Sequence, residues 1–156
     1  AWFWWGIDGP EACAELWRVM YKRMVEYHGL DNLIWVYNTG DSMRWFPGDE
    51  YVDIVAYDFY NQSMDGMKRI YDMMKKMFPT KLLAVSEFGN MPRISEQWAE
   101  GMYWCYFMPW WDNARTQDMN SDAFQSRDHN NANIEWWEDA LKCDFIVTRD
   151  ELPSFR

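Results

Sequence analysis

A carboxylate ends one of the apolar runs of this sequence. Residues 81–89 read Lys-Leu-Leu-Ala-Val-Ser-Glu-Phe-Gly, so Glu87 follows an apolar run and comes two residues before Gly89. Such a run is typical of a strand in a parallel sheet covered on both faces, and these sheets carry their chemistry at the carboxyl ends of the strands. Glu87 is therefore the first candidate for a chemical role. The alternative is a strand-end carboxylate held in a buried salt bridge.

Polar and aromatic residues stand beside this candidate in the pattern. A second apolar run, residues 52–57, also ends in polar groups, Asp58 and Tyr60. The chain has 12 tryptophans, and 19% of its residues are aromatic, more than a core of this size needs. Because indole stacks on flat apolar faces and keeps an N–H for polar partners, the excess favours a ligand such as a sugar ring.

Strands and helices are predicted to alternate along the chain. Strands are expected at 33–37, 52–57, 81–89 and 102–108, and helices at 63–77, 95–100 and 133–142. A first helix is expected to begin after Asp8 as its N-cap, and its apolar face runs from Cys13 to Tyr27. Residues 112–131 are predicted to form a long polar loop that contains His129, for which the sequence suggests no partner, and 145–148 a short extended tail. The alternation of strands and helices predicts an α/β fold with a parallel sheet that is either open or closed into a barrel. One structural unit over 1–156 is expected. No glycine-rich phosphate loop follows any strand, which weakens the nucleotide-binding option.

The charge and the cysteines exclude several classes of partner. A formal net charge of −10 argues against nucleic acid and against anionic membrane surfaces. Cys13, Cys105 and Cys143 have neither metal-ligand nor redox spacing, so we expect three buried or half-buried thiols and no disulfide framework. No metal-ligand set is apparent, no run is long enough to span a bilayer, and the start has no signal-peptide features.

Nine blocks of the sequence, in order, resemble glycoside hydrolase family 26, whose best-known members are secreted endo-β-1,4-mannanases. The blocks are Trp2-Phe3-Trp4-Trp5-Gly6, Gly9-Pro10-Glu11, Leu16-Trp17-Arg18, His28-Gly29-Leu30, Asn32-Leu33-Ile34-Trp35-Val36, Trp45-Phe46-Pro47-Gly48-Asp49, Tyr51-Val52-Asp53-Ile54-Val55, Ser86-Glu87-Phe88-Gly89 and Asp150-Glu151-Leu152-Pro153. Each block alone is weak, whereas the ordered set is specific. The resemblance covers essentially the whole chain.

The resemblance implies a (β/α)8 barrel and a retaining hydrolase that needs no cofactor. A complete barrel takes about 250 residues, so four strands would be the C-terminal half, strands five to eight. Glu87 would be the nucleophile at the end of strand seven. The family's acid/base glutamate stands a few residues before the block that begins at Trp2, so this sequence would lack it, and the chain alone is expected to be inactive.

Four further residues take roles from the resemblance. The family has an Asp-x-Tyr at Asp58-Phe59-Tyr60, and the phenol of Tyr60 would hydrogen-bond the nucleophile and favour its ionised form. Asp58 would fix Tyr60 or a nearby amide. Trp2 and Trp110 correspond to tryptophans of the family's sugar site. Pro109 stands where the family usually has Thr, so the resemblance does not determine the orientation of the Trp110 side chain. The simpler alternative is that Tyr60 packs a loop. Core or loop packing is expected for Trp4, Trp5, Trp35, Trp45, Trp104 and Trp111.

The expected partner is a polysaccharide, with β-mannan as substrate. Members of the same fold also act on mixed-linkage glucans or xylans, so a β-glucanase or xylanase is an alternative. A non-catalytic carbohydrate-binding module is a second one, disfavoured because such modules are usually β-sandwiches. We further expect secretion, from the family, and self-association of the isolated chain through open strand edges.

Overall fold

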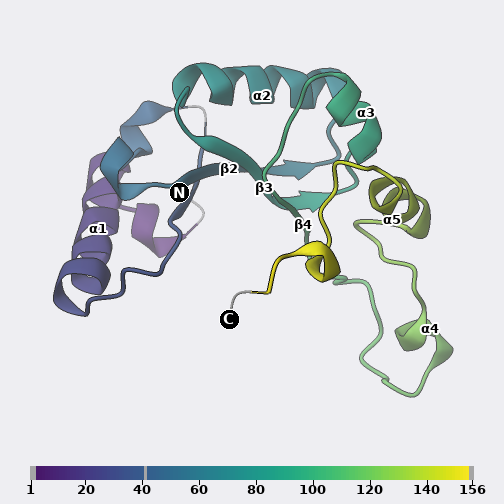
Figure 1. The fold of residues 1–156 in the computed structure, drawn as a ribbon. Helices are drawn as coiled ribbons and strands as arrows, with labels where there is room; N and C mark the ends of the chain where they lie inside the picture. The colour runs from purple at the N-terminus through teal and green to yellow at the C-terminus, as the bar shows by residue number, and fades with distance from the viewer. Residues whose placement is uncertain (1–2, 41, 155–156) are drawn as a thin grey trace. The chain divides into compact units, whose positions relative to one another are not determined.

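Four parallel strands alternate with helices in the computed structural model, which describes residues 3–40 and 42–154 (Figure 1). The strands are β1 (Val36–Asn38), β2 (Ile54–Tyr60), β3 (Leu82–Gly89) and β4 (Phe107–Pro109), in the spatial order β1-β2-β3-β4. The α-helices are α1 (Pro10–Lys22), α2 (Met64–Met77), α3 (Ile94–Ala99), α4 (Asp122–Gln125) and α5 (Ile134–Leu141). The α/β fold with a parallel sheet is confirmed.

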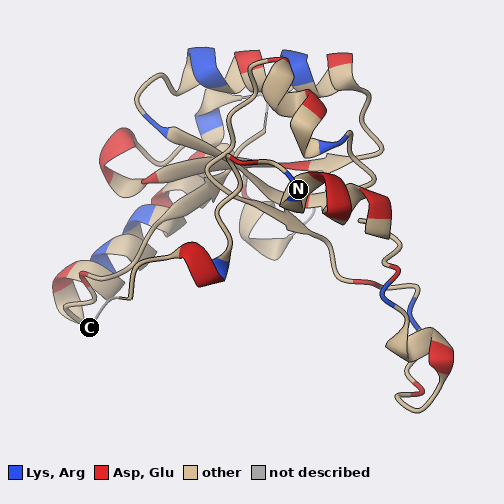
Figure 2. Cartoon of the chain, turned by 45° about the vertical axis from the view of Figure 1, so that its right-hand side comes forward, with Lys and Arg blue, Asp and Glu red and all other residues tan. Residues whose placement is uncertain are grey.

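Short helical segments complete the described chain. A π-helical segment, η2 (Arg23–Tyr27), continues α1, and 3-10 turns form η1 (Trp4–Gly6), η3 (Met43–Trp45), η4 (Asp49–Tyr51) and η5 (Arg149–Glu151). None of the helices in the described ranges is long and apolar enough to cross a membrane. Acidic and basic segments both occur along α2 (Figure 2), with Asp65 in its first turn and Lys75 and Lys76 in its last, the arrangement that complements the helix dipole.

The chain divides into two compact units. Unit 1 contains residues 1–58, 70–86 and 104–107, and unit 2 contains residues 59–69, 87–103 and 108–156. The boundary passes through β2 after Asp58 and through β3 after Ser86. The last residues of both strands therefore belong to unit 2.

Unit 1 has a core of strand residues and aromatic rings. Val55, Ala56, Ala84 and Val85 are completely buried, as expected for strands covered on both faces. Helix α1 is attached by Trp17, whose indole N–H donates to the carbonyl of Tyr51 at 3.1 Å.

Unit 2 is built around Phe59, Phe88 and Met67, which have no exposed surface. Trp136 of α5 lies against Phe88, with ring centroids 4.8 Å apart. Helices α3 and α5 are joined by Asp139, which accepts hydrogen bonds from the backbone N–H and the hydroxyl of Ser95 at 3.1 and 2.6 Å.

The element predictions hold for the long segments and are wrong at several ends. The strand expected from Leu33 begins only at Val36, because the carbonyl of Trp35 already accepts from both Asp53 and Ile54, and ladder pairing starts after it. The strand expected over 102–108 is reduced to Phe107–Pro109. Before it, Gly101 has φ +77° and the N–H of Met102 returns to α3, so the chain is still leaving the helix.

Two local predictions are also wrong. Asp8 does not cap α1; the N-cap is Gly9, with φ +92°, and Pro10 occupies the first turn as expected. Cys105 is exposed, whereas Cys13 and Cys143 are half-buried, and none of the three forms a disulfide.

Candidate active site

Glu87 and Tyr60 meet in unit 2. Glu87 lies two residues before the end of β3 and is half-buried, and Tyr60 is the last residue of β2. The Tyr60 hydroxyl donates a hydrogen bond to Oε1 of Glu87. The N–H of Asn61 donates to the carbonyl of Gly89 at 2.9 Å, so the two strand ends are fixed to each other beyond this pair. The side-chain bond holds the Glu87 carboxylate in one orientation.

Gly89 is required by the close packing at this strand end. A Cβ atom at position 89 would lie 2.7 Å from Oδ1 of Asn131 and 2.8 Å from Cδ1 of Tyr60, both closer than real Cβ contacts. The absence of a side chain is what allows the Tyr60 ring to reach Glu87 past the backbone of β3. The Glu-Phe-Gly sequence thus has a steric reason.

Trp110 belongs to the same unit. It follows β4 directly, and its N–H donates to the carbonyl of Phe88 at 2.8 Å. Its side chain is 40% exposed, so a large part of the indole is accessible to a ligand. The structure therefore joins Glu87 to Tyr60 and binds the backbone of Trp110 to the residue after Glu87, all within unit 2. Trp2 lies outside the described residues.

Asp58 is an anchor within unit 1. Its Oδ1 accepts from the Ser86 hydroxyl at 2.7 Å and its Oδ2 from the Asn38 side-chain amide at 2.7 Å. One carboxylate therefore bridges β1, β2 and β3. Asn38 ends β1 and Ser86 lies three residues before the end of β3. Neither was expected as a site residue.

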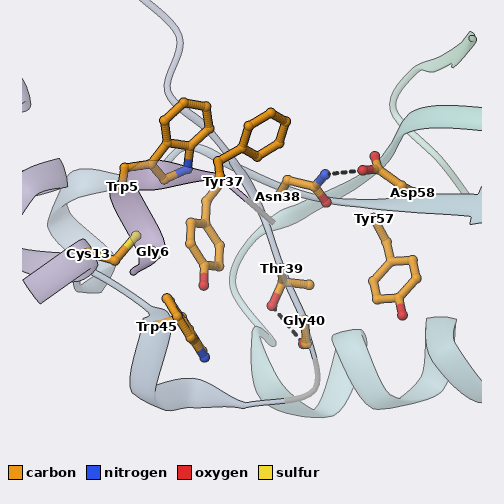
Figure 3. Close-up of a pocket in the computed structure, with 11 residues that line it drawn as sticks. Trp5, Gly6, Cys13, Tyr37, Asn38, Thr39, Gly40, Trp45, Tyr57 and Asp58 are labelled. Atoms are coloured by element: carbon orange, nitrogen blue, oxygen red, sulfur yellow. Dashed lines mark hydrogen bonds between the residues drawn. The ribbon is translucent and has the colours of Figure 1, made fainter. Parts of the chain in front are cut away.

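A cavity of about 520 Å³ opens beside Asp58 in unit 1 (Figure 3). Its lining includes the rings of Trp5, Tyr37 and Trp45 and the polar residues Asn38 and Asp58. Burial raises the pKa of Tyr37 to about 12; the charge of Cys13 also raises it, and a hydrogen bond with Thr39 lowers it. Tyr37 is therefore a neutral phenol near pH 7. The signal that could have pointed to this cavity is Asn38, a polar residue directly after an apolar run.

The remaining tryptophans divide between packing and exposure. Trp35 is buried and Trp45 and Trp104 are half-buried, which agrees with the expected packing role. Trp4, Trp5 and Trp111 are 70%, 44% and 57% exposed, so they do not lie in the core. Trp5 packs locally, with its ring centroid 4.3 Å from that of Phe3 and 5.7 Å from that of Trp4. Within residues 3–40 and 42–154, no group of three His, Cys, Asp or Glu side chains has an arrangement that could hold a metal ion.

Comparisons with known proteins identify the family of this chain. The sequence profile of glycosyl hydrolase family 26 matches residues 1–133. A mannan endo-1,4-β-mannosidase from Thermothelomyces thermophilus is 38% identical over 99% of this chain and 30% of its own length, and mannan endo-1,4-β-mannosidase A from a Piromyces species is 34% identical over 99% and 23%. The chain thus spans less than a third of the length of these two enzymes.

Solved structures of similar proteins have the same fold. The β-mannanase from a symbiotic protist of the termite Reticulitermes speratus, complexed with a gluco-manno-oligosaccharide, is 28% identical and superimposes with a TM-score of 0.78 over 99% of this chain and 45% of its own. The four parallel strands and their helices match part of the (β/α)8 barrel of these neighbours. The chain belongs to glycosyl hydrolase family 26.

Proposed function

We propose that this chain supplies the nucleophile of a retaining endo-β-1,4-mannanase. The observation that carries the proposal is the hydrogen bond from Tyr60 to Glu87, because it fixes one carboxylate oxygen and leaves the other to attack. Membership of a family that contains mannan endo-1,4-β-mannosidases supports the same reading.

In this mechanism, Glu87 attacks the anomeric carbon while a second carboxylic acid protonates the departing glycosidic oxygen. The bond from the anomeric carbon to the leaving oxygen breaks, and a covalent glycosyl-enzyme forms on Glu87. Water, deprotonated by the second group, then displaces Glu87 and restores both residues. The two carboxyl groups of such enzymes stand about 5 to 5.5 Å apart. We propose that the acid/base comes from sequence upstream of Ala1 in the complete protein, so that residues 1–156 alone have no turnover.

The proposed substrate is β-mannan. Trp110 offers an exposed indole beside the strand end that carries Glu87, and the C–H face of a pyranose buries well against such a ring. The names of the relatives support mannan over mixed-linkage glucan or xylan. Action on an extracellular polysaccharide also supports secretion of the complete protein.

The test uses the complete reading frame that contains this chain. We expect reducing sugar to be released from mannan faster than from glucan or xylan, and the first product to keep the β-configuration when followed by NMR. Glu87→Gln should lower kcat by about a thousandfold or more. Glu96→Gln, an exposed carboxylate of α3, is the matched control and should leave kcat unchanged. Inversion at the anomeric carbon, or an active Glu87→Gln enzyme, would contradict the proposal.

A non-catalytic carbohydrate-binding role is the second candidate, and the exposed indoles of Trp110 and Trp111 favour it. It predicts retention on immobilised mannan that is lost in Trp110→Ala and unchanged in Glu87→Gln. Turnover of mannan by the complete protein, lost in Glu87→Gln, would reject it.

A further inference from the structure

A long segment joins β4 to α5 (Figure 1). Asn131 is a buried polar residue near the end of this segment. Only 8% of it is exposed, and its hydrogen bonds run to two other segments of unit 2. Its carbonyl accepts from the N–H of Asn90 at 3.0 Å, just beyond β3. Its side-chain amide donates to the carbonyl of Trp111 at 3.1 Å, just beyond β4. A single residue therefore connects the two strand ends that carry Glu87 and Trp110.

The contact with β3 is also steric. Oδ1 of Asn131 faces the Cα of Gly89 so closely that a Cβ built there would be 2.7 Å away. Tyr60 meets the same position from the other strand, because its ring would be 2.8 Å from that Cβ. Asn131 and Tyr60 thus both lie against Gly89, two residues after Glu87.

His129 holds Asn131 in place. Its Nδ1 accepts hydrogen bonds from the backbone N–H groups of Asn131 at 3.1 Å and Ala132 at 3.3 Å. This arrangement gives a role to a histidine whose partner the sequence did not reveal.

The rest of the loop is closed by Arg115. Its guanidinium pairs with Asp112 at 2.7 Å and donates to the carbonyls of Phe124 and Ser126, both at 2.7 Å, and to that of Asp128. These bonds connect Asp112, which follows Trp111, with residues 124–128, which precede His129 and Asn131. The loop is therefore a defined support for Asn131.

We propose that Asn131 is a positioning residue for the sugar site: it holds the Trp110-Trp111 segment against the carboxyl end of β3 and so sets the indole of Trp110 relative to Glu87. The inference rests on the proposed function for its effect on catalysis. The Trp110 N–H on the carbonyl of Phe88 gives one fixed point, and the Asn131 amide on the carbonyl of Trp111 gives the second. Two points on consecutive residues fix the direction in which the indole projects.

The test compares Asn131→Asp with Asn133→Ala, a control from the same loop. Asn131→Asp keeps the shape but replaces the donor to Trp111 with an acceptor, whereas Asn133→Ala removes the N-cap of α5, whose Oδ1 accepts from Trp136 at 2.9 Å. In the complete enzyme, we expect Asn131→Asp to lower kcat/KM on a manno-oligosaccharide by about tenfold, chiefly through KM, because a misplaced binding ring weakens substrate positioning. Asn133→Ala should lower the melting temperature with kcat/KM within about twofold.

A second readout does not need activity. With 5-fluorotryptophan incorporated and Trp110 assigned from Trp110→Phe, we expect the fluorine resonance of Trp110 to shift or broaden in Asn131→Asp and to stay in place in Asn133→Ala. If Asn131→Asp does not fold, His129→Ala and His129→Asn replace it. The first should move the resonance, and the second should restore it, because the Asn Oδ1 can accept where Nδ1 did.

The outcomes separate this inference from the proposed function. A wild-type enzyme without action on any glycan would reject the proposed function, while the fluorine spectra would still judge the position of Trp110. An unmoved resonance overturns the inference. So does a moved resonance with unchanged kcat/KM in an active enzyme, or equal effects of Asn131→Asp and Asn133→Ala, which would make Asn131 a structural residue only.

Discussion

Tyr60 and Glu87 are 27 residues apart in the chain and are joined by one hydrogen bond, from the phenol to Oε1 of the carboxylate. The contact arises because both stand within the last three residues of neighbouring parallel strands, whose carboxyl ends meet on one edge of the sheet. The sheet therefore brings a donor to the carboxylate without any local sequence motif that contains both.

Removal of the phenol should weaken catalysis more than folding. In the complete enzyme, Tyr60→Phe should lower kcat by at least about tenfold, because the Glu87 carboxylate loses the donor that orients it. The melting temperature should change little, since the Tyr60 side chain is 38% exposed. Tyr103→Phe, with a ring 52% exposed, is the matched control for loss of a hydroxyl. Equal kcat values for the two variants would refute an orienting role for Tyr60.

A methyl group at position 89 should disturb the same strand end. Gly89→Ala places a Cβ within 3.0 Å of both the Tyr60 ring and Asn131, so the strand end must shift, at a cost of about 1 to 3 kcal/mol in the free energy of unfolding. Gly40→Ala has no neighbour within 4 Å and should leave the free energy of unfolding almost unchanged. Urea titrations of both variants measure the difference, and equal midpoints would contradict the steric argument.

The sequence predicts the parts of this site that local patterns mark, and it does not predict the contacts between segments that are far apart in the chain. The placement of Glu87 and Tyr60 follows from two apolar runs that end in polar residues, a pattern with a clear physical cause. Their pairing and the position of Trp110 required the family resemblance. Asn131 was not predictable, because its partners, Asn90 and Trp111, lie far away in the sequence, just beyond β3 and β4. A polar loop also has no periodicity that would mark a buried amide.

Asp58 should contribute to stability through its two donors. Asp58→Ala leaves the amide of Asn38 and the hydroxyl of Ser86 without their acceptor and should cost about 1 to 3 kcal/mol in the free energy of unfolding. Ser86→Ala removes only one of the two bonds and should cost less. Combined in one chain, the two substitutions should cost less than their sum, because the Ser86 bond is lost only once. Strict additivity in urea denaturation would count against the Ser86–Asp58 bond.

Tyr37 should make the protein sensitive to alkali. Its pKa rises from 10 to about 12 on folding, mainly because burial disfavours the phenolate. Between these values the unfolded state loses its proton and the folded state keeps it, so stability is complete below pH 10 and falls as the pH rises toward 12. The two-unit difference corresponds to about 3 kcal/mol in the free energy of unfolding. Urea midpoints from pH 9 to 12 should fall more steeply in the wild type than in Tyr37→Phe, and parallel curves would contradict the assignment.

The isolated 156-residue chain should self-associate through the edges of its sheet. In the described structure the strand order ends at β1 and β4, and an edge strand offers unpaired backbone groups to another chain. Met108 of β4 is 56% exposed, so it adds an apolar surface to one edge. Sedimentation velocity should show species larger than the monomer, and Met108→Lys should reduce them because a charged edge resists strand pairing. Leu141→Lys on α5, at a side chain 61% exposed, adds the same charge away from the strands and should leave the distribution unchanged. A wild-type chain that sediments as a monomer, or equal effects of the two lysines, would show that the strand edges do not drive association.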